Sequence, residues 1–385
     1  MISYPKLGGS NISKEKNVKK KILVLFLLST MILGGCSTQK ITDSSSQKEE
    51  AQEAKNQDIS EESTDGEADE SQEASKDVFA MDTYMTVTAY GSHGEEAVEK
   101  AAAEIERLDG LLSTGEESSE IAQVNANGGG TLGKDASYLV ERALEFGKST
   151  GGAFDIAIYP IMKEWGFTTG DFKVPSKETL DSLLEKTKLS DVVFDKETST
   201  ISFKTDGMAI DLGGIAKGYT STRIMDIYRE CGVKSGLVNL GGNVQALGTK
   251  TDGSKWRVAI QGVEDDDSYL GVLSISDKAV ITSGGYERYF EQDGVTYHHI
   301  IDPTTGYPAD SGLLSVSIVS ADGTMCDALS TSLFIMGKDK AIEYWRAHSD
   351  EFDMILYDKE NKVYVSEGIA EDFTSDFDTE VVKKE

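Results

Sequence analysis

The stretch from residue 322 to residue 337, "DGTMCDALSTSLFIMG", combines an apolar helical pattern with two oxygen-bearing side chains, Asp327 and Thr331. Residues four apart lie on one face of a helix, about one turn from each other. A carboxylate and a hydroxyl at that spacing are hard oxygen ligands, which suit Mg²⁺ better than zinc. The same spacing also suits a helix that Asp327 caps and in which Thr331 bonds back to its own backbone. The spacing alone leaves both interpretations open.

Three glycine-containing stretches have the composition of a ligand site: "DLGGIAKGY" (211–219), "VNLGGNVQALG" (238–248) and "HHIIDPTTGYP" (298–308). The first predicts a strand that turns on paired glycines into a helix, where amide hydrogens either bind an anion or only complete a tight turn. It is neither a dinucleotide-binding fingerprint nor a P-loop. The second predicts a hairpin with Gly-Gly-Asn at its turn.

The third stretch contains two adjacent histidines, His298 and His299. Adjacent residues of a strand point to opposite faces, so at most one of the two enters a given site. Asp302 and Pro303 then predict a rigid turn. No spacing of His, Cys and carboxylate residues in the chain fits a zinc site.

The elements that must position these residues are predicted from hydrophobic periodicity and turn signals. Helices are expected near 95–113, 136–149, 155–165, 176–188, 215–230, 324–336 and 339–347. Strands are expected near 81–90, 191–195, 199–204, 207–211, 236–248, 255–261, 270–276, 279–291, 295–301, 313–319, 352–358 and 362–367. Runs of strands interrupted by helices predict an α+β fold with mixed or antiparallel sheets and packed helices.

The first 36 residues resemble a secretory signal, with a lysine-rich start, an apolar run from Ile22 to Leu33 and small residues before Cys36. The apolar run is shorter than the ~20 residues of a membrane span, although a single-span anchor is the alternative. "LGGC" resembles a bacterial lipobox, which implies lipidation of Cys36 and a membrane anchor. Cys231 and Cys326 either pair or stay free, and the apolar helical context of Cys326 favours a buried thiol.

Four segments follow from composition: a signal peptide (1–36), a disordered acidic tether (37–77), a folded domain (78–370) and an acidic C-terminal tail (371–385). The whole chain carries a net charge of −29, the signal +5 and the tether −9, which leaves −25 for the remainder. A surface of that charge repels nucleic acid. A phosphate-bearing ligand would need a local counter-charge, such as a divalent cation.

Four of these motifs, "DLGGIAKGY", "NLGGN", "HHIIDPTTGYP" and "DALSTSLFIMG", occur in this order after "MDTYMTV". In this the chain closely resembles the ApbE family of FAD:protein FMN transferases, over about residues 78–370. The resemblance implies a T-fold-like α+β architecture. It also implies an enzyme that uses Mg²⁺ to split FAD, attaches FMN to a threonine or serine of a client redox protein and releases AMP.

The resemblance also implies roles for individual residues. Asp327, Thr331 and the main-chain carbonyl of Ala216 would bind Mg²⁺, and His299 would accept a proton. Asp302 would shape the loop that follows. The FAD site would be formed by Met81, Ala153, Phe154, Asp155, Gly213, Tyr219 and Ile301.

One position departs from the family pattern, because this chain has Gly115 where an aromatic residue is usual. Two alternatives to the transferase stay open: a Mg²⁺-dependent FAD pyrophosphatase, in which water replaces the client hydroxyl, and a non-catalytic flavin-binding lipoprotein. With the lipobox, we expect a protein anchored by lipid on the extracytoplasmic face of the cell membrane. The identity of the client does not follow from the sequence.

Overall fold

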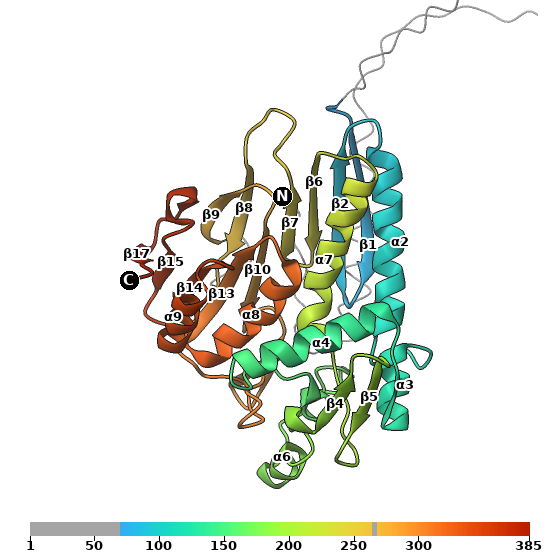
Figure 1. The fold of residues 1–385 in the computed structure, drawn as a ribbon. Helices are drawn as coiled ribbons and strands as arrows, with labels where there is room; N and C mark the ends of the chain where they lie inside the picture. Colours follow the sequence, from blue (N-terminus) through green and yellow to red (C-terminus); the bar gives the residue numbers. More distant parts are fainter. Residues whose placement is uncertain (1–69, 264–267) are drawn as a thin grey trace, which may run out of the picture. The chain divides into compact units, whose positions relative to one another are not determined.

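The computed structural model describes residues 70–263 and 268–385 (Figure 1). The predicted signal, the lipidation site Cys36 and the tether up to residue 69 lie outside the described residues. No helix in the described part is long and apolar enough to cross a membrane.

A nine-stranded sheet forms the centre of the described chain. Its neighbouring strands are antiparallel, except for the last pair, which is parallel. In spatial order the strands are β1 (Glu73–Ala80), β2 (Thr83–Tyr90), β6 (Ser235–Leu240), β7 (Asn243–Leu247), β10 (Ala279–Gly284), β13 (Leu313–Ser320), β14 (Asp353–Asp358), β15 (Lys362–Ser366) and β17 (Asp378–Val382).

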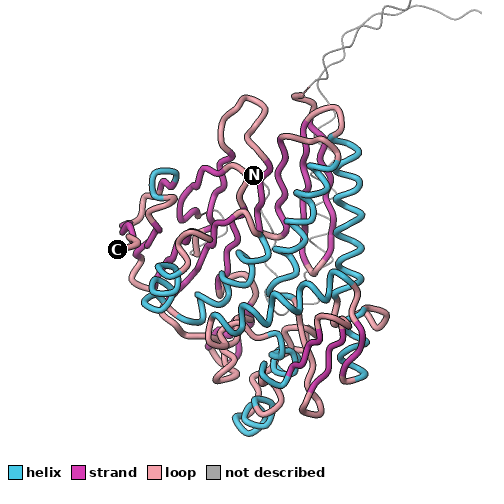
Figure 2. Tube along the Cα trace, in the orientation of Figure 1, coloured by secondary structure: helices cyan, strands magenta, loops and turns pink. Residues whose placement is uncertain are grey.

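Helices cover one face of this sheet (Figures 1 and 2). The helix α2 (Gly94–Leu112) lies on β1 and β2, α7 (Gly213–Glu230) lies on β6 and β7, and α8 (Gly323–Met336) lies on β10 and β13. The alternation of β2 explains this packing, because Met85, Val87 and Ala89 are buried under α2 while the residues between them are less buried. A period of two along a strand directs one set of side chains to one face.

A small sheet covers part of the opposite face. It consists of β16 (Phe373–Thr374), β9 (Tyr269–Ile275) and β8 (Trp256–Gln261), in that order. Its side chains Trp256, Val258 and Leu273 share a hydrophobic cluster with Val319 of β13 and Ile355 of β14. The central sheet is therefore buried on both sides in this region.

Most of the remaining elements lie at one end of the sheet, and α4 (Lys134–Ser149) crosses in front of α7 and α8 (Figure 1). They are α3 (Glu120–Asn127), α5 (Tyr159–Trp165), α6 (Lys177–Leu184), β3 (Gly129–Thr131), β4 (Val192–Asp195), β5 (Thr200–Phe203), β11 (Tyr289–Gln292), β12 (Val295–His298) and the short 3₁₀ helices Ile156–Ile158 and Leu189–Asp191. An aromatic cluster that contains Trp165, Phe167 and Phe290 joins the hairpin β11–β12 to the helices near it.

Two further helical segments pack elsewhere. The helix α9 (Lys338–Ala347) contacts α8 and β14, and the 3₁₀ helix Ala370–Asp372 contacts β9 of the small sheet.

The helices α7 and α8 cross at two glycines, Gly218 and Gly323. A methyl group added to Gly218 would lie 2.1 Å from the carbonyl oxygen of Gly323 and 2.6 Å from Cβ of Asp327. A methyl group on Gly323 would lie 2.6 Å from the carbonyl oxygen of Gly218. Only residues without a side chain permit this separation, which explains the last glycine of "GGIAKGY".

The predicted α+β fold is confirmed, with differences at the ends of the folded part. The strand β1 starts at Glu73 and pairs with β2, so the tether does not extend to Asp77 as predicted. The segment 371–385 is not only a tail, because β17 pairs with β15 and buries Val382. In both cases pairing with a strand of the sheet orders a segment that its acidic composition alone did not place in the fold.

Two further differences lie inside the chain. The predicted strand 207–211 pairs with no other strand in the described residues. Instead, the side-chain amide of Asn125 accepts from the backbone N–H of Ile210 at 2.7 Å and donates to its carbonyl at 2.8 Å. Asn125 belongs to α3, a helix that the sequence did not predict. Cys231 and Cys326 are both free, and Cys326 is buried as expected.

We predict that Gly218→Ala destabilises the protein by about 1–3 kcal/mol, the usual penalty of overpacking. Urea unfolding monitored by circular dichroism measures the effect. Gly110→Ala is the matched control, because Gly110 lies in α2 with nothing near the added methyl group; there we expect a gain of roughly 0.5–1 kcal/mol. Equal effects of the two substitutions would contradict the close crossing.

Candidate functional site

The carboxylate of Asp327 lies where α7, α8 and β7 meet. Its Oδ2 accepts the backbone N–H of Gly218 at 2.8 Å, and its Oδ1 accepts the side-chain N–H of Asn243 at 3.2 Å. The residue is 5 % exposed. Asp327 is not the cap of α8, because Asp322 accepts from the backbone N–H of Met325 and has that role. The structure therefore removes the capping interpretation of Asp327.

Both partners of this carboxylate are uncharged. Among the described residues, no lysine, arginine or histidine forms an ion pair with Asp327. A buried carboxylate is normally paired with a cation or bound to a metal ion. The carboxylate of Asp327 is thus held in place by two hydrogen bonds from uncharged groups.

The residues around Asp327 fit a cation such as Mg²⁺. An ionised carboxylate has about four acceptor positions, of which the two donors use two. Thr331 lies one turn further along α8, and its hydroxyl hydrogen-bonds to that of Ser283 on β10 at 3.2 Å. The carbonyl of Ala216 also accepts the hydroxyl of Thr220 at 2.8 Å. The oxygens of Asp327, Thr331 and Ala216 are hard ligands of the kind that Mg²⁺ prefers. In the described part of the chain, no group of three or more His, Cys, Asp or Glu side chains could hold a metal ion.

The paired glycines Gly213 and Gly214 are the first two residues of α7. The backbone N–H of Gly213 donates to Oδ1 of Asp211 at 2.7 Å. The ring of Phe154 packs against Gly214, where an added methyl group would lie 3.2 Å from Cε2 of the ring. The predicted residues Phe154 and Gly213 are therefore brought to the same turn, at the end of the helix whose amide hydrogens favour an anion.

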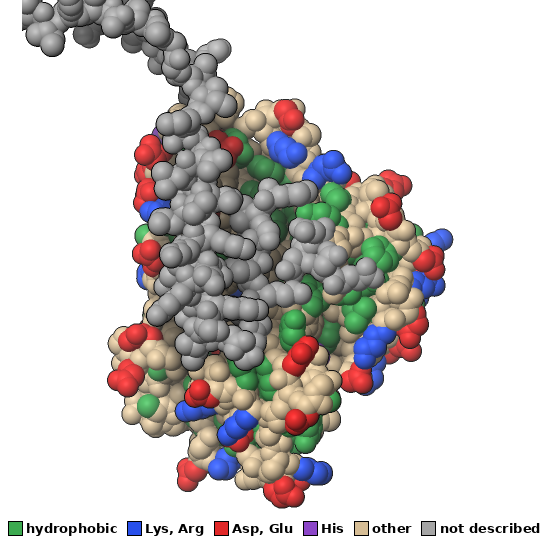
Figure 3. Space-filling model, turned by 180° about the vertical axis from the view of Figure 1, so that it is seen from behind, with side chains coloured by type: hydrophobic (Ala, Val, Ile, Leu, Met, Phe, Trp, Pro, Cys, Tyr) green, Lys and Arg blue, Asp and Glu red, His purple; other side chains and the backbone are tan. Residues whose placement is uncertain are grey.

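Charged side chains gather next to this turn. Glu287 is exposed to solvent, yet desolvation by the surrounding protein raises its pKa to about 7; the charge of Lys217 lowers this pKa and the charge of Asp327 raises it further. Desolvation likewise raises the pKa of Asp211, which the N–H of Gly213 and the charges of Arg288 and Lys217 partly oppose. The positive charge of Lys217 thus acts on both carboxyl groups. Elsewhere acidic and basic side chains are interspersed, as on the face in Figure 3.

The structure distinguishes the two adjacent histidines. His298 uses both ring nitrogens, since Nε2 is 3.1 Å from the carbonyl oxygen of Ala309 and Nδ1 accepts from the N–H of Ile300 at 3.3 Å. His299 has Nδ1 3.1 Å from the carbonyl oxygen of Arg288. A carbonyl can only accept, so Nδ1 of a neutral His299 carries the proton and Nε2 keeps its lone pair. Of the two, His299 is the ring that can accept a proton.

The pKa of His299 lies well below ambient pH, where a general base works best. Burial lowers the pKa of His299 to about 3, and the positive charges of Arg288, His298 and Lys217 contribute. The edge of the Phe167 ring lies beside the imidazole, with ring centroids 6.4 Å apart. His299 is therefore neutral at physiological pH, and an approaching anionic ligand would raise its pKa.

Three other residues assigned to the flavin site lie on different elements. Met81 has a positive φ of 48° in the turn between β1 and β2, and that turn lies beside the β6–β7 turn, because a methyl group on Gly241 would overlap Thr83. Ile301 is buried in the aromatic cluster of Trp165. Ala153 precedes Phe154 in the loop after α4. Their role as flavin contacts stays a prediction.

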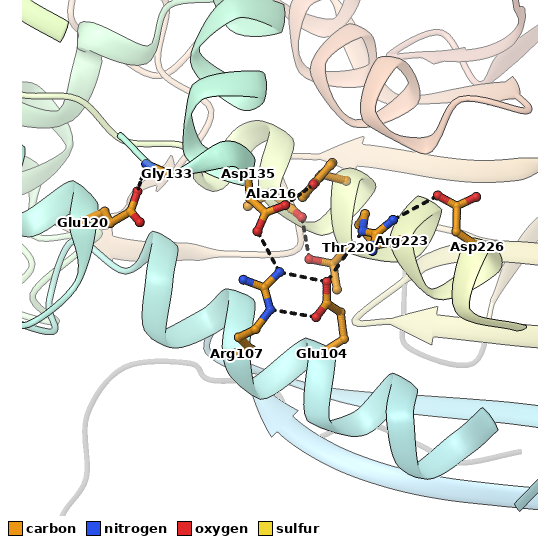
Figure 4. Close-up of polar contacts among 10 residues, drawn as sticks. Glu104, Arg107, Glu120, Gly133, Asp135, Ala216, Thr220, Arg223 and Asp226 are labelled. Atoms are coloured by element: carbon orange, nitrogen blue, oxygen red, sulfur yellow. Dashed lines mark hydrogen bonds and ion pairs between the residues drawn. The ribbon is translucent and has the colours of Figure 1, made fainter. Parts of the chain in front are cut away.

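Tyr219 takes part in a polar network rather than lying free. Its hydroxyl donates to Oδ1 of Asp135 at 2.5 Å, and Oδ2 of Asp135 is paired with Arg107 at 2.7 Å. Arg107 also binds Glu104, which lies 3.6 Å from Arg223 (Figure 4). The network joins α2, α4 and α7, and thereby fixes the helix that carries Ala216.

Sequence reasoning missed Asn243, Ser283, Lys217 and Glu287. Asn243 stands in "NLGGN", a motif that was assigned only to a turn, and Lys217 stands inside "GGIAKGY". Nothing in the sequence around Ser283 or Glu287 marks them. All four become visible only when the segments that carry them are brought together.

The ApbE family model matches residues 81–356. The chain belongs to this family. Among its relatives, the FAD:protein FMN transferase of Klebsiella pneumoniae (strain 342) is 35 % identical over 278 residues, which cover 71 % of this chain and 86 % of that protein. The FAD:protein FMN transferase of Treponema pallidum (strain Nichols) is 32 % identical over 320 residues, which cover 78 % and 88 %.

Solved structures agree with the ApbE assignment. The ApbE protein of Thermotoga maritima superposes with a TM-score of 0.72 at 32 % identity, covering 77 % of this chain and 98 % of that one. The flavin transferase ApbE of Vibrio cholerae, at 24 % identity, shows the same fold with a TM-score of 0.68 over 80 % and 97 %. The predicted family, the ApbE-like α+β fold and the prediction of an enzyme of this family are confirmed.

We predict a pH-dependent penalty at Asp155. Burial raises its pKa to about 7, although its Oδ1 accepts from the N–H of Ala157 at 2.7 Å. The folded state then binds more protons than the unfolded state between about pH 4 and 7, so stability falls as pH rises through this window. Asp155→Asn removes this penalty and keeps the oxygen that accepts the hydrogen bond. Relative to the wild type, we expect the free energy of unfolding of the variant to be higher at pH 8 than at pH 4 by on the order of 1 kcal/mol.

Thermal unfolding of both proteins at pH 4 and pH 8 measures the difference. Asp195→Asn is a control of opposite sign, because the backbone N–H of Thr198 lowers the pKa of Asp195. A pH-independent effect of Asp155→Asn would contradict the raised pKa.

Proposed function

We propose that this protein is a Mg²⁺-dependent FAD:protein FMN transferase that attaches FMN through a phosphoester to a threonine or serine of a client redox protein and releases AMP. The observation that carries the proposal is the buried carboxylate of Asp327, held by two uncharged donors beside the glycine turn of α7. The names of the relatives support FAD and a protein as the two substrates.

The residues around Asp327 and the first turn of α7 have separate roles in this reaction. The positive end of the α7 dipole favours the diphosphate of FAD, and Lys217 binds it. Asp327, Thr331 and the carbonyl of Ala216 would hold Mg²⁺, which neutralises charge on the diphosphate when it is bound. The chain from residue 78 onwards has a net charge of −25 and requires such neutralisation before a dianionic group can approach.

The proton transfer falls to His299. Its Nε2 accepts the proton of the client hydroxyl while the hydroxyl oxygen forms a bond to the phosphorus on the FMN side of FAD. The bond from that phosphorus to the bridging oxygen breaks, and AMP leaves with that oxygen. The neutral state of His299 keeps Nε2 ready for this proton.

Lipidation of Cys36 would anchor the enzyme on the extracytoplasmic face of the membrane, where the tether gives it reach toward membrane-bound clients. Signal, lipobox and acidic tether in the sequence support this location. Globomycin treatment of cells that express the full chain tests it, since blocked signal cleavage shifts the protein to higher mass. Unchanged mobility would refute the anchor.

The activity is tested by incubation of the protein with FAD, Mg²⁺ and a detergent extract of membranes from the organism that encodes it. We expect a client that gains the mass of an FMN phosphoester and fluoresces after denaturing electrophoresis, with one AMP released per label. FMN released into solution faster than any protein is labelled would instead identify a pyrophosphatase.

We predict that Asp327→Asn lowers turnover at least ~100-fold, because a bound cation contributes several kcal/mol to the transition state. Turnover is measured as AMP released at saturating FAD. Asp322→Ala is the matched control on the same helix: it removes the cap of α8, costs about 1 kcal/mol of stability and leaves turnover within a few-fold. An unchanged rate in Asp327→Asn would refute the metal assignment.

A further inference from the structure

The side chain of Asn243 contacts the carboxylate oxygen of Asp327 that Gly218 does not bind. Its Nδ2 donates to Oδ1 at 3.2 Å across 84 residues of sequence, and the two residues are 4 % and 5 % exposed. Gly218 holds the other oxygen. The two oxygens are thus fixed by two different elements, so that rotation of the carboxylate would break at least one bond.

The "NLGGN" hairpin explains why Asn243 is aimed at this point. Gly241 and Gly242 have φ values of +66° and +99°, which permit a two-residue turn between β6 and β7. Oδ1 of Asn239 accepts the N–H of Gly242 at 2.8 Å, and Leu240 pairs with Asn243. The turn therefore ends at a defined residue, and Asn243 starts β7 with its side chain toward the helices.

The chemistry of the amide suits a cation site. A lysine or arginine at this position would also hold the carboxylate, but its charge would repel the incoming cation. The uncharged amide of Asn243 fixes Oδ1 of Asp327 and leaves the negative charge of the carboxylate available to a cation. A similar arrangement serves the second side-chain ligand, because the hydroxyl of Ser283 on the neighbouring strand β10 hydrogen-bonds to Thr331 at 3.2 Å.

We infer that Asn243 is a positioning residue, which orients the carboxylate of Asp327 for the divalent cation. The inference rests on the proposed function, since it assumes that Asp327 binds Mg²⁺. Partners of metal-binding carboxylates typically change metal affinity or activity by about 10–100-fold when they are removed. The last asparagine of "NLGGN" thereby has a function apart from the turn.

The test is Asn243→Ala in the folded protein with FAD bound. We expect Mg²⁺ to bind roughly 10–100-fold more weakly in calorimetric titration. The affinity for FAD, measured without Mg²⁺, should stay within about two-fold of the wild-type value. The loss of AMP release should be restored at high Mg²⁺ concentration, because the ligands themselves remain. Damage to the fold alone would not be corrected by the cation.

Gln245→Ala is the matched control, since Gln245 is a buried amide two residues further along β7. It bonds to the hydroxyl of Ser221 at 2.6 Å and to the carbonyl of Ala321 at 3.2 Å, but not to Asp327. We expect it to lower the unfolding temperature without changing the Mg²⁺ affinity.

Three outcomes would overturn the inference. Wild-type Mg²⁺ affinity in Asn243→Ala would show that the amide does not position the carboxylate. An equal loss in Gln245→Ala would show that any damage to β7 has the same effect. Absence of Mg²⁺ binding in the wild-type protein would refute the cation site of the proposed function, and the role of Asn243 with it.

Discussion

The structure depends on the contact between α7 and α8, where two glycine backbones cross and the carboxylate of Asp327 accepts the N–H of Gly218. Because no side chain separates the helices, an acidic residue of one can reach the backbone of the other. The same crossing fixes where α7 begins relative to α8. The glycine turn, Lys217 and the carbonyl of Ala216 are consequently placed around one carboxylate.

The arrangement of charges around Asp327 follows from this contact. Buried charges usually stay charged only when they are paired, yet Asp327 is held by neutral groups. Positive charge is supplied nearby by Lys217 and Arg288, whose effects reach Asp211, Glu287 and His299. Local positive charge of this kind offsets the acidity of the chain near the first turn of α7, as the proposed binding of a diphosphate requires.

Elements defined by local signals could be predicted from the sequence. The helix α8 has an apolar pattern and a glycine stop, and the structure has it at 323–336, with Asp322 rather than Asp327 as its cap. The hairpin at 235–247 followed from paired glycines. Among the assigned site residues, Phe154 with Gly213 and Asp327 with Thr331 lie together as pairs in the structure.

Features that depend on distant residues could not be predicted. The segment 207–211 looked like a strand, but the backbone of Ile210 bonds to the side chain of Asn125, 85 residues away, and the N–H of Asp211 bonds to the carbonyl of Ile156. Asn243 and Ser283 matter only because β7 lies under α7 and β10 lies under α8, next to Asp327 and Thr331. The low pKa of His299 likewise arises from burial by segments that are remote in sequence.

The order of strands in the central sheet has a consequence for how the molecule is made. From β1 to β17, spatial order follows chain order, so every new strand joins an edge that already exists. The sheet can grow in one direction from the N-terminal to the C-terminal strands, without rearrangement of earlier strands. The segments between neighbouring strands supply α7, α8 and the loop after His298 and His299, so these parts of the site are added as the sheet grows.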